Sequence, residues 1–256
     1  MKLSVALAVY NEEENLARCL NSIKDLAEEI VVVDGGSQDK TVEIAQKFKA
    51  KIITTNNPPI FHINKQIALE ACQGEWILQL DADEEVTKEL AQEIKDIIGQ
   101  ERSAAGFFLK RRNYFLGTWL KKGGQYPDPV IRLIKNGKGK FPCVSVHEQI
   151  EVGGEVGWLQ NDLLHYAVLN FSKYLINSNR YTTLTAREYA EKKITISHFN
   201  IINYLFWQPF ITFCNLYFRH KGFTDGFPGL VFALYSGLHL RTSFVKYWEE
   251  TKQKGS

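Results

Sequence analysis

The sequence predicts an α/β protein with a Rossmann-like, mostly parallel sheet in α/β/α layers, followed by a helical C-terminal region. Short apolar runs, typical of buried parallel strands, alternate with segments whose apolar residues recur at helical spacing. A β-α-β-α-β order is complete within about 55 residues, which favours a parallel sheet with right-handed crossovers. The chain has 256 residues, 45% of them hydrophobic, enough for one sizeable core and a small appendage.

The first three strands are expected at Leu3–Val9, Ile30–Val33 and Lys51–Thr54. The segment Tyr10–Asn15 is expected to open a helix that carries Leu16, Cys19, Leu20 and Ile23 at helical spacing, and acidic residues in its first turn suit the positive end of the helix dipole. A second helix is expected from Thr41 to Phe48, after two glycines that permit a tight turn and Asp and Ser residues that can cap it.

An acidic segment follows the next buried strand, Trp76–Leu80. Residues 81–85 read Asp-Ala-Asp-Glu-Glu, so four carboxylates crowd the point where the strand ends. Ligands of open α/β sheets bind at the carboxyl ends of strands, and a Mg²⁺ or Mn²⁺ ion with substrate phosphates would relieve the repulsion. The alternative is an acidic N-cap for the helix Lys88–Ile98, which starts near Thr87.

Asp34 stands at the carboxyl end of the second strand, where dinucleotide-binding folds hold a ribose hydroxyl. No Gly-rich turn follows the first strand. The turn there reads Tyr10-Asn11-Glu12-Glu13, too acidic and bulky to wrap a pyrophosphate, which excludes an NAD site but not a nucleotide site. Tyr10 offers a ring for base stacking, or it packs on the sheet edge.

Lys65 lies near the start of a helix expected over Asn64–Cys72, after an irregular loop. It is placed to reach a phosphate, although a solvated helix lysine is equally compatible with the sequence.

The next part of the chain departs from a plain doubly wound pattern. Strands are expected at Ala105–Arg112, Val130–Ile134 and Leu159–Leu164, with a hairpin turn at Asn136-Gly137. Aromatic and glycine-rich loops between residues 113 and 129 suit sugar rings, and they also suit ordinary loop packing. Arg132 would meet an anionic acceptor or lie on the surface.

The C-terminal region begins with a long helix, expected over Phe171–Lys193. Residues 194–218 are dense in aromatic and aliphatic side chains but contain several polar residues and Pro209, and the run Leu230–Leu240 is short. A spanning helix needs about 20 predominantly apolar residues. We therefore expect helices that lie on a membrane face, with Trp207 and tyrosines at headgroup level, the alternatives being a buried helical pair or a homodimer interface.

Charge is distributed unevenly along the chain. Residues 1–100 contain 10 Lys and Arg against 18 Asp and Glu, whereas residues 171–256 contain 11 against 5. The basic, aromatic C-terminal part favours an anionic membrane surface or partner, or is a solvated basic face. The four cysteines form no CxxC pair, which indicates reduced thiols, and no targeting signal is visible.

Four features occur in one order that resembles inverting glycosyltransferases of family 2, which have the GT-A fold. They are the Tyr10-Asn11-Glu12-Glu13 turn, Asp34 in Val-Asp-Gly-Gly-Ser-Gln-Asp-Lys-Thr, Asp81-Ala82-Asp83-Glu84, and His147-Glu148. The resemblance is strong over residues 1 to about 150. Further motifs resemble the lipopolysaccharide core-region β-glucosyltransferases: Tyr126-Pro127-Asp128 with Arg132-Leu133, Val146-His147-Glu148, Leu164-His165-Tyr166, and Lys221-Gly222-Phe223-Thr224-Asp225-Gly226.

The resemblance implies roles for individual residues. Asp81 and Asp83 match the DxD motif, with Asp83 holding the metal, and Asp34 would accept from a uracil-like imide N–H. Glu148 matches the catalytic base, although His147 stands where many relatives have a second acid, so His147 is the other candidate. His165 is either a further metal ligand or a core or acceptor-site histidine. The residues implied to contact the nucleotide sugar are Ala8, Tyr10, Glu12, Asp34, Lys65, Asp81, Ala82 and Asp83.

The function implied is a metal-dependent hexosyltransferase that uses Mg²⁺ or Mn²⁺ and moves a sugar, glucose by resemblance, from a UDP-sugar to a lipid-linked saccharide such as lipopolysaccharide core. Residues 1–168 would form the GT-A domain and residues 169–256 a membrane-associating region. The protein would be peripheral on the cytoplasmic face of the cell membrane and would have no nucleic-acid partner. The alternatives are a noncatalytic nucleotide-sugar-binding scaffold, or a nucleotidyltransferase, which would normally have a basic phosphate loop after the first strand.

Overall fold

The computed structural model describes residues 2–100, 103–144, 148–168 and 170–254. His147 and part of its loop lie outside these ranges. The chain forms two compact units. The first comprises residues 1–111 and 128–165, and the second comprises residues 112–127 and 166–256. Residues 112–127 thus group with the C-terminal helices.

The parallel half of the sheet is built from the four expected strands. They are β1 (Leu3–Val9), β2 (Glu29–Asp34), β3 (Lys51–Thr54) and β4 (Trp76–Leu80). Their order is β3-β2-β1-β4, and all three pairings are parallel. Val9 pairs with Asp34, and Leu7 with Leu80, so the segments after β1, β2 and β4 leave the sheet at one edge.

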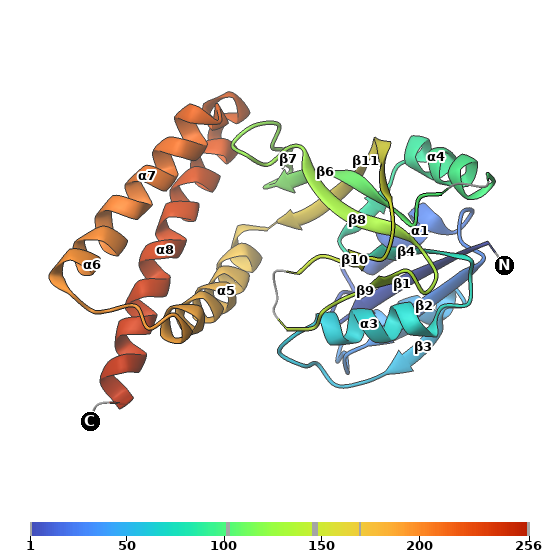
Figure 1. Ribbon diagram of the computed structural model, residues 1–256, viewed down its shortest axis with the longest axis horizontal. Coiled ribbons are helices and arrows are strands. Elements are labelled where there is room, and N and C mark those ends of the chain that lie inside the picture. The colour runs from blue at the N-terminus through green and yellow to red at the C-terminus, as the bar shows by residue number, and fades with distance from the viewer. Residues whose placement is uncertain (1, 101–102, 145–147, 169, 255–256) are drawn as a thin grey trace. The chain divides into compact units, whose positions relative to one another are not determined.

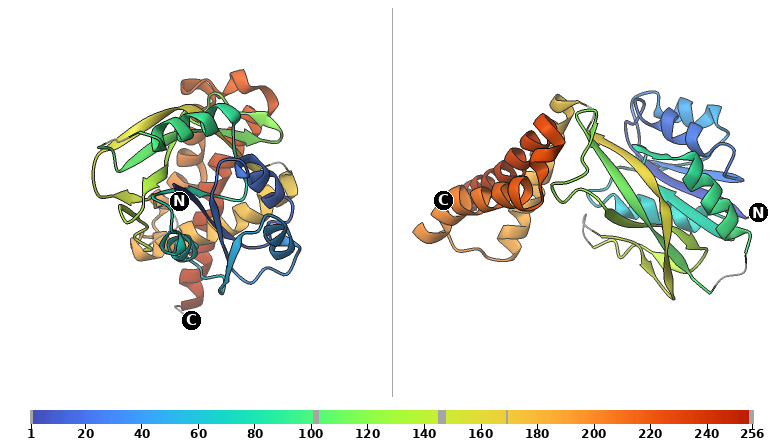
Figure 2. Two further views of the ribbon diagram at one scale, coloured as in Figure 1. Left: turned by 90° about the vertical axis from the view of Figure 1, so that its right-hand side faces the viewer. Right: turned by 90° about the horizontal axis from the view of Figure 1, so that it is seen from above.

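Helices cover both faces of the first unit's sheet. They are α1 (Leu16–Ile23), α2 (Thr41–Lys47), α3 (His62–Ala71) and α4 (Lys88–Ile98). Alternate residues of β1 point to opposite faces, as strand geometry requires. Leu3, Val5 and Leu7 pack in a core with α1 and α4, whereas Ala6 packs in a second core with α3. This three-layer arrangement (Figures 1 and 2) confirms the predicted α/β class.

Antiparallel strands extend the sheet beyond β4. They are β8 (Asp128–Lys135), β6 (Gly106–Phe115), β11 (Val156–Val168) and β5 (Glu84–Val86), with β7 (Thr118–Trp119) paired to β6. β8 lies between β4 and β6 and is antiparallel to both. Residues from the middle of the chain thereby lie beside the acidic end of β4.

The predicted hairpin at Asn136-Gly137 is wrong. The turn itself forms, with the Lys138 N–H donating to the Lys135 carbonyl over 3.0 Å. The strand that follows, β9 (Gly139–Lys140), pairs with β10 (Glu151–Val152) rather than folding back on β8. Both neighbouring positions of β8 are already taken by β4 and β6, so no ladder remains for a hairpin partner.

The second unit is helical beyond β7. It contains α5 (Phe171–Glu191), α8 (Gly226–Lys254) and, between them, a continuous helical segment over residues 198–219. That segment consists of α6 (His198–Ile202), the π-helical η1 (Asn203–Trp207), α7 (Gln208–Cys214) and the π-helical η2 (Asn215–Arg219), and the 3₁₀ turn η3 (Gly222–Asp225) follows it. We call residues 198–219 the long segment; it runs beside α8 (Figure 1).

Close approach of the long segment to α8 depends on a glycine. A Cβ on Gly237 would stand 2.7 Å from the Pro209 carbonyl oxygen, closer than real Cβ contacts allow.

Among the helices of the described residues, none combines the length and the apolarity that crossing a membrane requires.

Candidate active site

The acidic segment, residues 81–85, follows β4 directly and runs into the short strand β5. β4 is wholly buried, and β5 pairs with β11 so that Glu84 lies opposite His165. The expected alternative of an acidic N-cap is wrong, because the Thr87 hydroxyl caps α4 by accepting from the Leu90 N–H over 3.1 Å. The carboxylates of Asp81, Asp83 and Glu84 are therefore free of a capping role.

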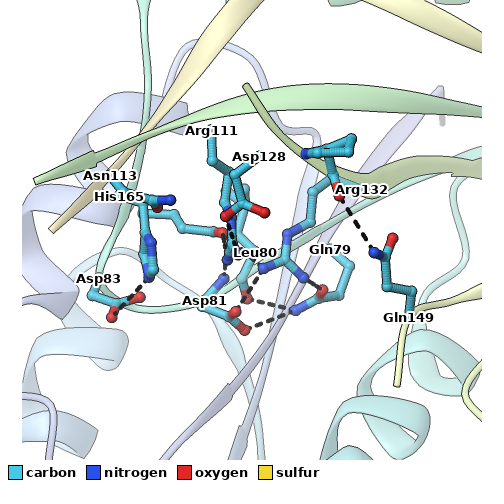
Figure 3. A network of polar contacts seen from close by, with 12 residues as sticks. Gln79, Leu80, Asp81, Asp83, Arg111, Asn113, Asp128, Arg132, Gln149 and His165 are labelled. Carbon is cyan, nitrogen blue, oxygen red and sulfur yellow. Dashed lines mark hydrogen bonds and ion pairs between the residues drawn. The ribbon is translucent and has the colours of Figure 1, made fainter. Parts of the chain in front are cut away.

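Asp81 is the acceptor of two buried cations. Lys65 Nζ pairs with Asp81 Oδ1. Arg132 Nη2 lies 2.6 Å from Asp81 Oδ2 (Figure 3). Gln79 Nε2 donates to Oδ1 over 3.2 Å. Burial would raise the pKa of Asp81, but the charges of Arg132 and Lys65 outweigh it and hold the pKa well below its usual range.

Lys65 projects from α3 into an aromatic environment. Its ammonium lies 5.0 Å from the centre of the Phe61 ring and 5.9 Å from that of Phe141. Burial lowers the pKa of Lys65, while Asp81 acts in the opposite sense. The solvated-lysine interpretation is therefore wrong, since Lys65 is buried and faces the acidic segment.

Arg132 is also buried, so a surface position is excluded. Its Nη2 donates to Glu84 Oε1 over 2.7 Å as well as to Asp81, and Nη1 donates to Gln79 Oε1. Arg111 adds a contact of 3.5 Å to Glu84 and pairs with Asp128 at 2.7 Å. One arginine inside the apolar run of β8 is the sequence signal that could have predicted a paired, buried charge.

Asp83 faces His165 from the other side of the segment. His165 Nε2 and Asp83 Oδ2 are 3.5 Å apart (Figure 3). Burial would lower the pKa of His165, but the Asp83 charge and hydrogen bond outweigh it and raise the pKa. For Asp83 the same pairing overcomes burial and lowers the pKa.

Asp34 lies at the same sheet edge as the acidic segment. Its carboxylate accepts the backbone N–H groups of Gly36 at 3.1 Å and Ser37 at 3.1 Å, which fix its orientation, and only 2% of the residue is exposed. Tyr10 follows β1 and is 42% exposed, so its ring does not lie buried against the sheet. Ala8 pairs with Val33 inside the sheet.

The loop that carries Glu12 is tied to the neighbouring loop. The Glu12 N–H donates to the Thr41 hydroxyl over 2.8 Å, and its carboxylate accepts from Asn15 at 2.8 Å. Ala82 is buried between the two aspartates of the motif. Among the described residues, the structure thus places Ala8 and Asp34 near the carboxyl ends of β1 and β2 and Tyr10 and Glu12 in the loop after β1. It brings Lys65, Asp81, Asp83 and His165 together at the end of β4.

Glu148 is oriented by backbone donors. Its carboxylate accepts the N–H groups of Cys143 at 2.7 Å and Val144 at 2.6 Å. His62 Nδ1 lies 3.9 Å from Glu148 Oε2. The imidazole ring of His62 stacks on the Phe141 ring. The sequence pattern placed His62 in an irregular loop and indicated no role for it. In the structure His62 is the buried first residue of α3.

The comparisons with known proteins agree with this architecture. The profile for Glycosyl transferase family 2 matches residues 4–151. A Rhizobium meliloti protein described as lipopolysaccharide core biosynthesis glycosyltransferase LpsC is 30% identical over 97% of this chain and 93% of its own length. An uncharacterised Rickettsia typhi glycosyltransferase is 27% identical over 90% of this chain and 81% of its own.

Solved structures give a weaker likeness. The crystal structure of Staphylococcus aureus TarS residues 1–349 in complex with UDP aligns with a TM-score of 0.49 and 16% identity, covering 100% of this chain and 92% of that one. The profile match over more than half of the chain and the near full-length relative are the decisive findings. They show that the chain belongs to glycosyltransferase family 2 and is a glycosyltransferase.

Proposed function

We propose that this glycosyltransferase is an inverting, metal-dependent enzyme that moves a sugar, glucose by resemblance, from a UDP-sugar to a lipid-linked saccharide of the lipopolysaccharide core type. The observation that carries the proposal is the convergence, at one edge of the sheet, of Asp34, of the Lys65–Asp81–Arg132 ion pairs and of Asp83 with His165. The relative named for lipopolysaccharide core biosynthesis supports the acceptor class.

Asp34 and Tyr10 serve the nucleoside. Asp34 is fixed by its own loop with a carboxylate that can accept from the imide N–H of uracil, and the exposed Tyr10 ring is available to stack on the base. Cytosine has no such imide N–H, so this carboxylate disfavours a cytidine donor; thymine shares the imide N–H, and the choice of uridine rests on the family resemblance.

The donor set fits a divalent cation. Mg²⁺ and Mn²⁺ commonly take one or two protein side chains and complete their coordination with phosphates and water. Asp83 and His165 offer two adjacent donors, while both oxygens of Asp81 are engaged by cations. Within the described ranges, no set of three or more His, Cys, Asp or Glu side chains forms a metal site without substrate. We therefore assign the metal to Asp83 with His165, and Asp81 to a supporting role.

The chain's own groups account for the departure of the nucleotide. A metal, when bound, supplies charge neutralisation at the diphosphate. Lys65 brings a positive charge to the same sheet edge, and Asp81 holds the ammonium in place. The aromatic rings around Lys65 restrict water, which strengthens its electrostatic effect.

Glu148 is our candidate for the base, with His147 as the other. The base takes the proton of an acceptor hydroxyl, whose oxygen forms a bond to the anomeric carbon from the face opposite the diphosphate. The bond from that carbon to the diphosphate oxygen breaks, so the configuration inverts and UDP leaves with the electron pair. Two backbone N–H donors keep the Glu148 carboxylate in one orientation.

We place the reaction at the cytoplasmic face of the membrane, with residues 1–168 as the transferase domain and residues 169–256 as the part that associates with lipid. A lipid-linked acceptor lies at that surface, and a peripheral enzyme there has access to a nucleotide sugar made in the cytoplasm.

A thermal-shift panel tests the donor assignment. UDP, GDP, CDP and dTDP are each added with and without Mn²⁺; a ligand at a hundredfold excess over its Kd raises the unfolding free energy by about 2.7 kcal/mol. We expect stabilisation by UDP that requires Mn²⁺ and is absent in Asp34→Ala, with the exposed Asp96→Ala as control. Stabilisation by another nucleotide, or UDP stabilisation that persists without metal, would overturn the corresponding part of the proposal.

A further inference from the structure

The long segment exposes one apolar side along its length. Phe199, Ile202, Phe206 and Phe210 recur at helical spacing and are 76%, 60%, 62% and 59% exposed. Side chains three and four residues apart lie on the same side of a helix. Trp207, beside Phe206, is 58% exposed. Contiguous exposed aromatic surface of this kind marks an interaction site rather than chance exposure.

The opposite side of the same segment packs inside the second unit. Ile201, Tyr204 and Leu205 join the core formed by α5 and α8, where Tyr204 stacks on Phe244 with ring centres 4.8 Å apart. Pro209 is buried where Gly237 lets α8 approach. The segment is thus held in place by one side, and its exposed side is presented by a packed scaffold.

α8 extends the apolar side. Its Leu238 and Val245 are 38% and 48% exposed, and Arg241 lies between them in the helix. Arg241 reaches the long segment: its Nε donates to the Leu205 carbonyl over 2.8 Å, and its guanidinium lies 5.7 Å from the centre of the Phe206 ring. The two helices therefore form one surface, which we call the apolar face: Phe199, Ile202, Phe206, Phe210, Leu238 and Val245.

Basic residues outnumber acidic ones in the part of the chain that carries the apolar face, although Glu249 and Glu250 follow Val245 on α8. Residues 192–248 contain six Lys and Arg residues and one acidic residue, Asp225. Asp225 is occupied within the unit, because its carboxylate accepts the backbone N–H groups of Lys121 at 3.2 Å and Lys122 at 2.9 Å. An apolar surface with a cationic surround complements anionic lipid: the acyl chains accept the aromatic side chains, and the headgroups accept the cations.

We propose that the apolar face is a membrane-docking surface, which lies in the headgroup and upper acyl region of an anionic bilayer with the long segment parallel to the membrane plane. No helix of the described part of the chain is long and apolar enough to cross a bilayer. The inference deepens the proposed function by naming the residues that bring the enzyme to a lipid-linked acceptor, but it can fail independently of the donor assignment.

Vesicle flotation of the full chain tests the proposal. We expect flotation with vesicles of phosphatidylcholine and phosphatidylglycerol, little flotation with phosphatidylcholine alone, and weakening by salt. The double variant Phe206→Ser and Phe210→Ser should lower the partition coefficient roughly tenfold or more, because two exposed rings lose their transfer into lipid. Ile176→Ser is the matched control, since Ile176 on α5 is 70% exposed and lies outside the apolar face.

A second variant tests the charge. Arg219→Gln with Lys221→Asn should weaken binding to anionic vesicles at low salt and leave any residual binding to neutral vesicles unchanged. Asn is chosen at 221 because that residue has a φ of 57°, which Asn tolerates.

Three results would overturn the proposal. They are no flotation of the wild-type chain with anionic vesicles, unchanged flotation of the Phe206 and Phe210 variant, and a dimer in light scattering that this variant converts to a monomer, which would assign the face to a second copy. UDP-dependent thermal shifts are measured on the same samples. Loss of flotation with an intact UDP shift isolates the docking surface, whereas loss of the UDP shift with intact flotation isolates the donor site.

Discussion

Arg132 and Glu84 meet at 2.7 Å between Nη2 and Oε1, although 48 residues separate them in the chain. Glu84 is completely buried, and its second carboxylate oxygen accepts the Asp81 N–H over 2.9 Å. Arg132 also holds the Asp81 side chain. The position of the acidic segment is therefore set by a buried guanidinium on β8, the strand next to β4.

Removing that guanidinium should destabilise the protein strongly. Arg132→Met leaves Asp81 and Glu84 without their shared cation, and breaking a buried pair from one side typically costs about 3 to 5 kcal/mol. Urea denaturation would measure the change. The control Lys138→Met removes an exposed charge and should change stability by less than about 0.5 kcal/mol. A loss for Arg132→Met as small as that of the control would show that the network contributes nothing.

Asp83 and His165 should differ in how strictly the metal requires them. Asp83→Asn removes the anionic ligand and should abolish transfer, whereas His165→Gln should raise the Mn²⁺ concentration for half-maximal transfer by roughly 10- to 100-fold. Initial rates over a Mn²⁺ titration measure both. The exposed His198→Gln is the control. An unchanged Mn²⁺ dependence in His165→Gln would remove that histidine from the metal site.

Cys72 should make the protein less stable at high pH. Burial, with a contribution from Glu29, raises the pKa of its thiol from 9.0 to about 12. Between these values the unfolded chain loses a proton that the folded chain keeps, so stability falls as pH rises, by up to about 1.4 kcal/mol per pH unit. Denaturation of wild type and Cys72→Ala across this range would give a smaller slope for the variant. Parallel slopes would contradict the assignment to Cys72.

Gly237→Ala should destabilise the second unit despite the better helix propensity of alanine. The added Cβ would stand 2.7 Å from the Pro209 carbonyl oxygen, so the long segment must shift away from α8. Overpacking of this kind costs typically about 1 to 3 kcal/mol, more than the roughly 1 kcal/mol that the propensity gain returns at most. Thermal unfolding checks the result, with the exposed Thr242→Ala on the same helix as control. A higher melting temperature for Gly237→Ala would mean that the contact relaxes without cost.

The sequence by itself determined the strands and helices of the parallel half and the places of Asp34 and the acidic segment. Those features are local, because an apolar run, a glycine turn and a capping residue act within a few positions of one another. The order of the motifs was likewise enough to indicate the family, which the comparisons then showed.

Only the tertiary structure decided what surrounds these residues. The sequence left Lys65 as phosphate ligand or solvated helix residue and Arg132 as acceptor ligand or surface residue. Both are buried partners of Asp81, which excludes the solvated and surface alternatives. It also predicted a hairpin where β9 pairs with β10. Antiparallel pairing of β8 with β4 joins residues more than fifty positions apart, as Arg132 and Gln79 are. Such contacts depend on which strand lies next to which, and the periodicity of a single segment carries no information about its neighbour.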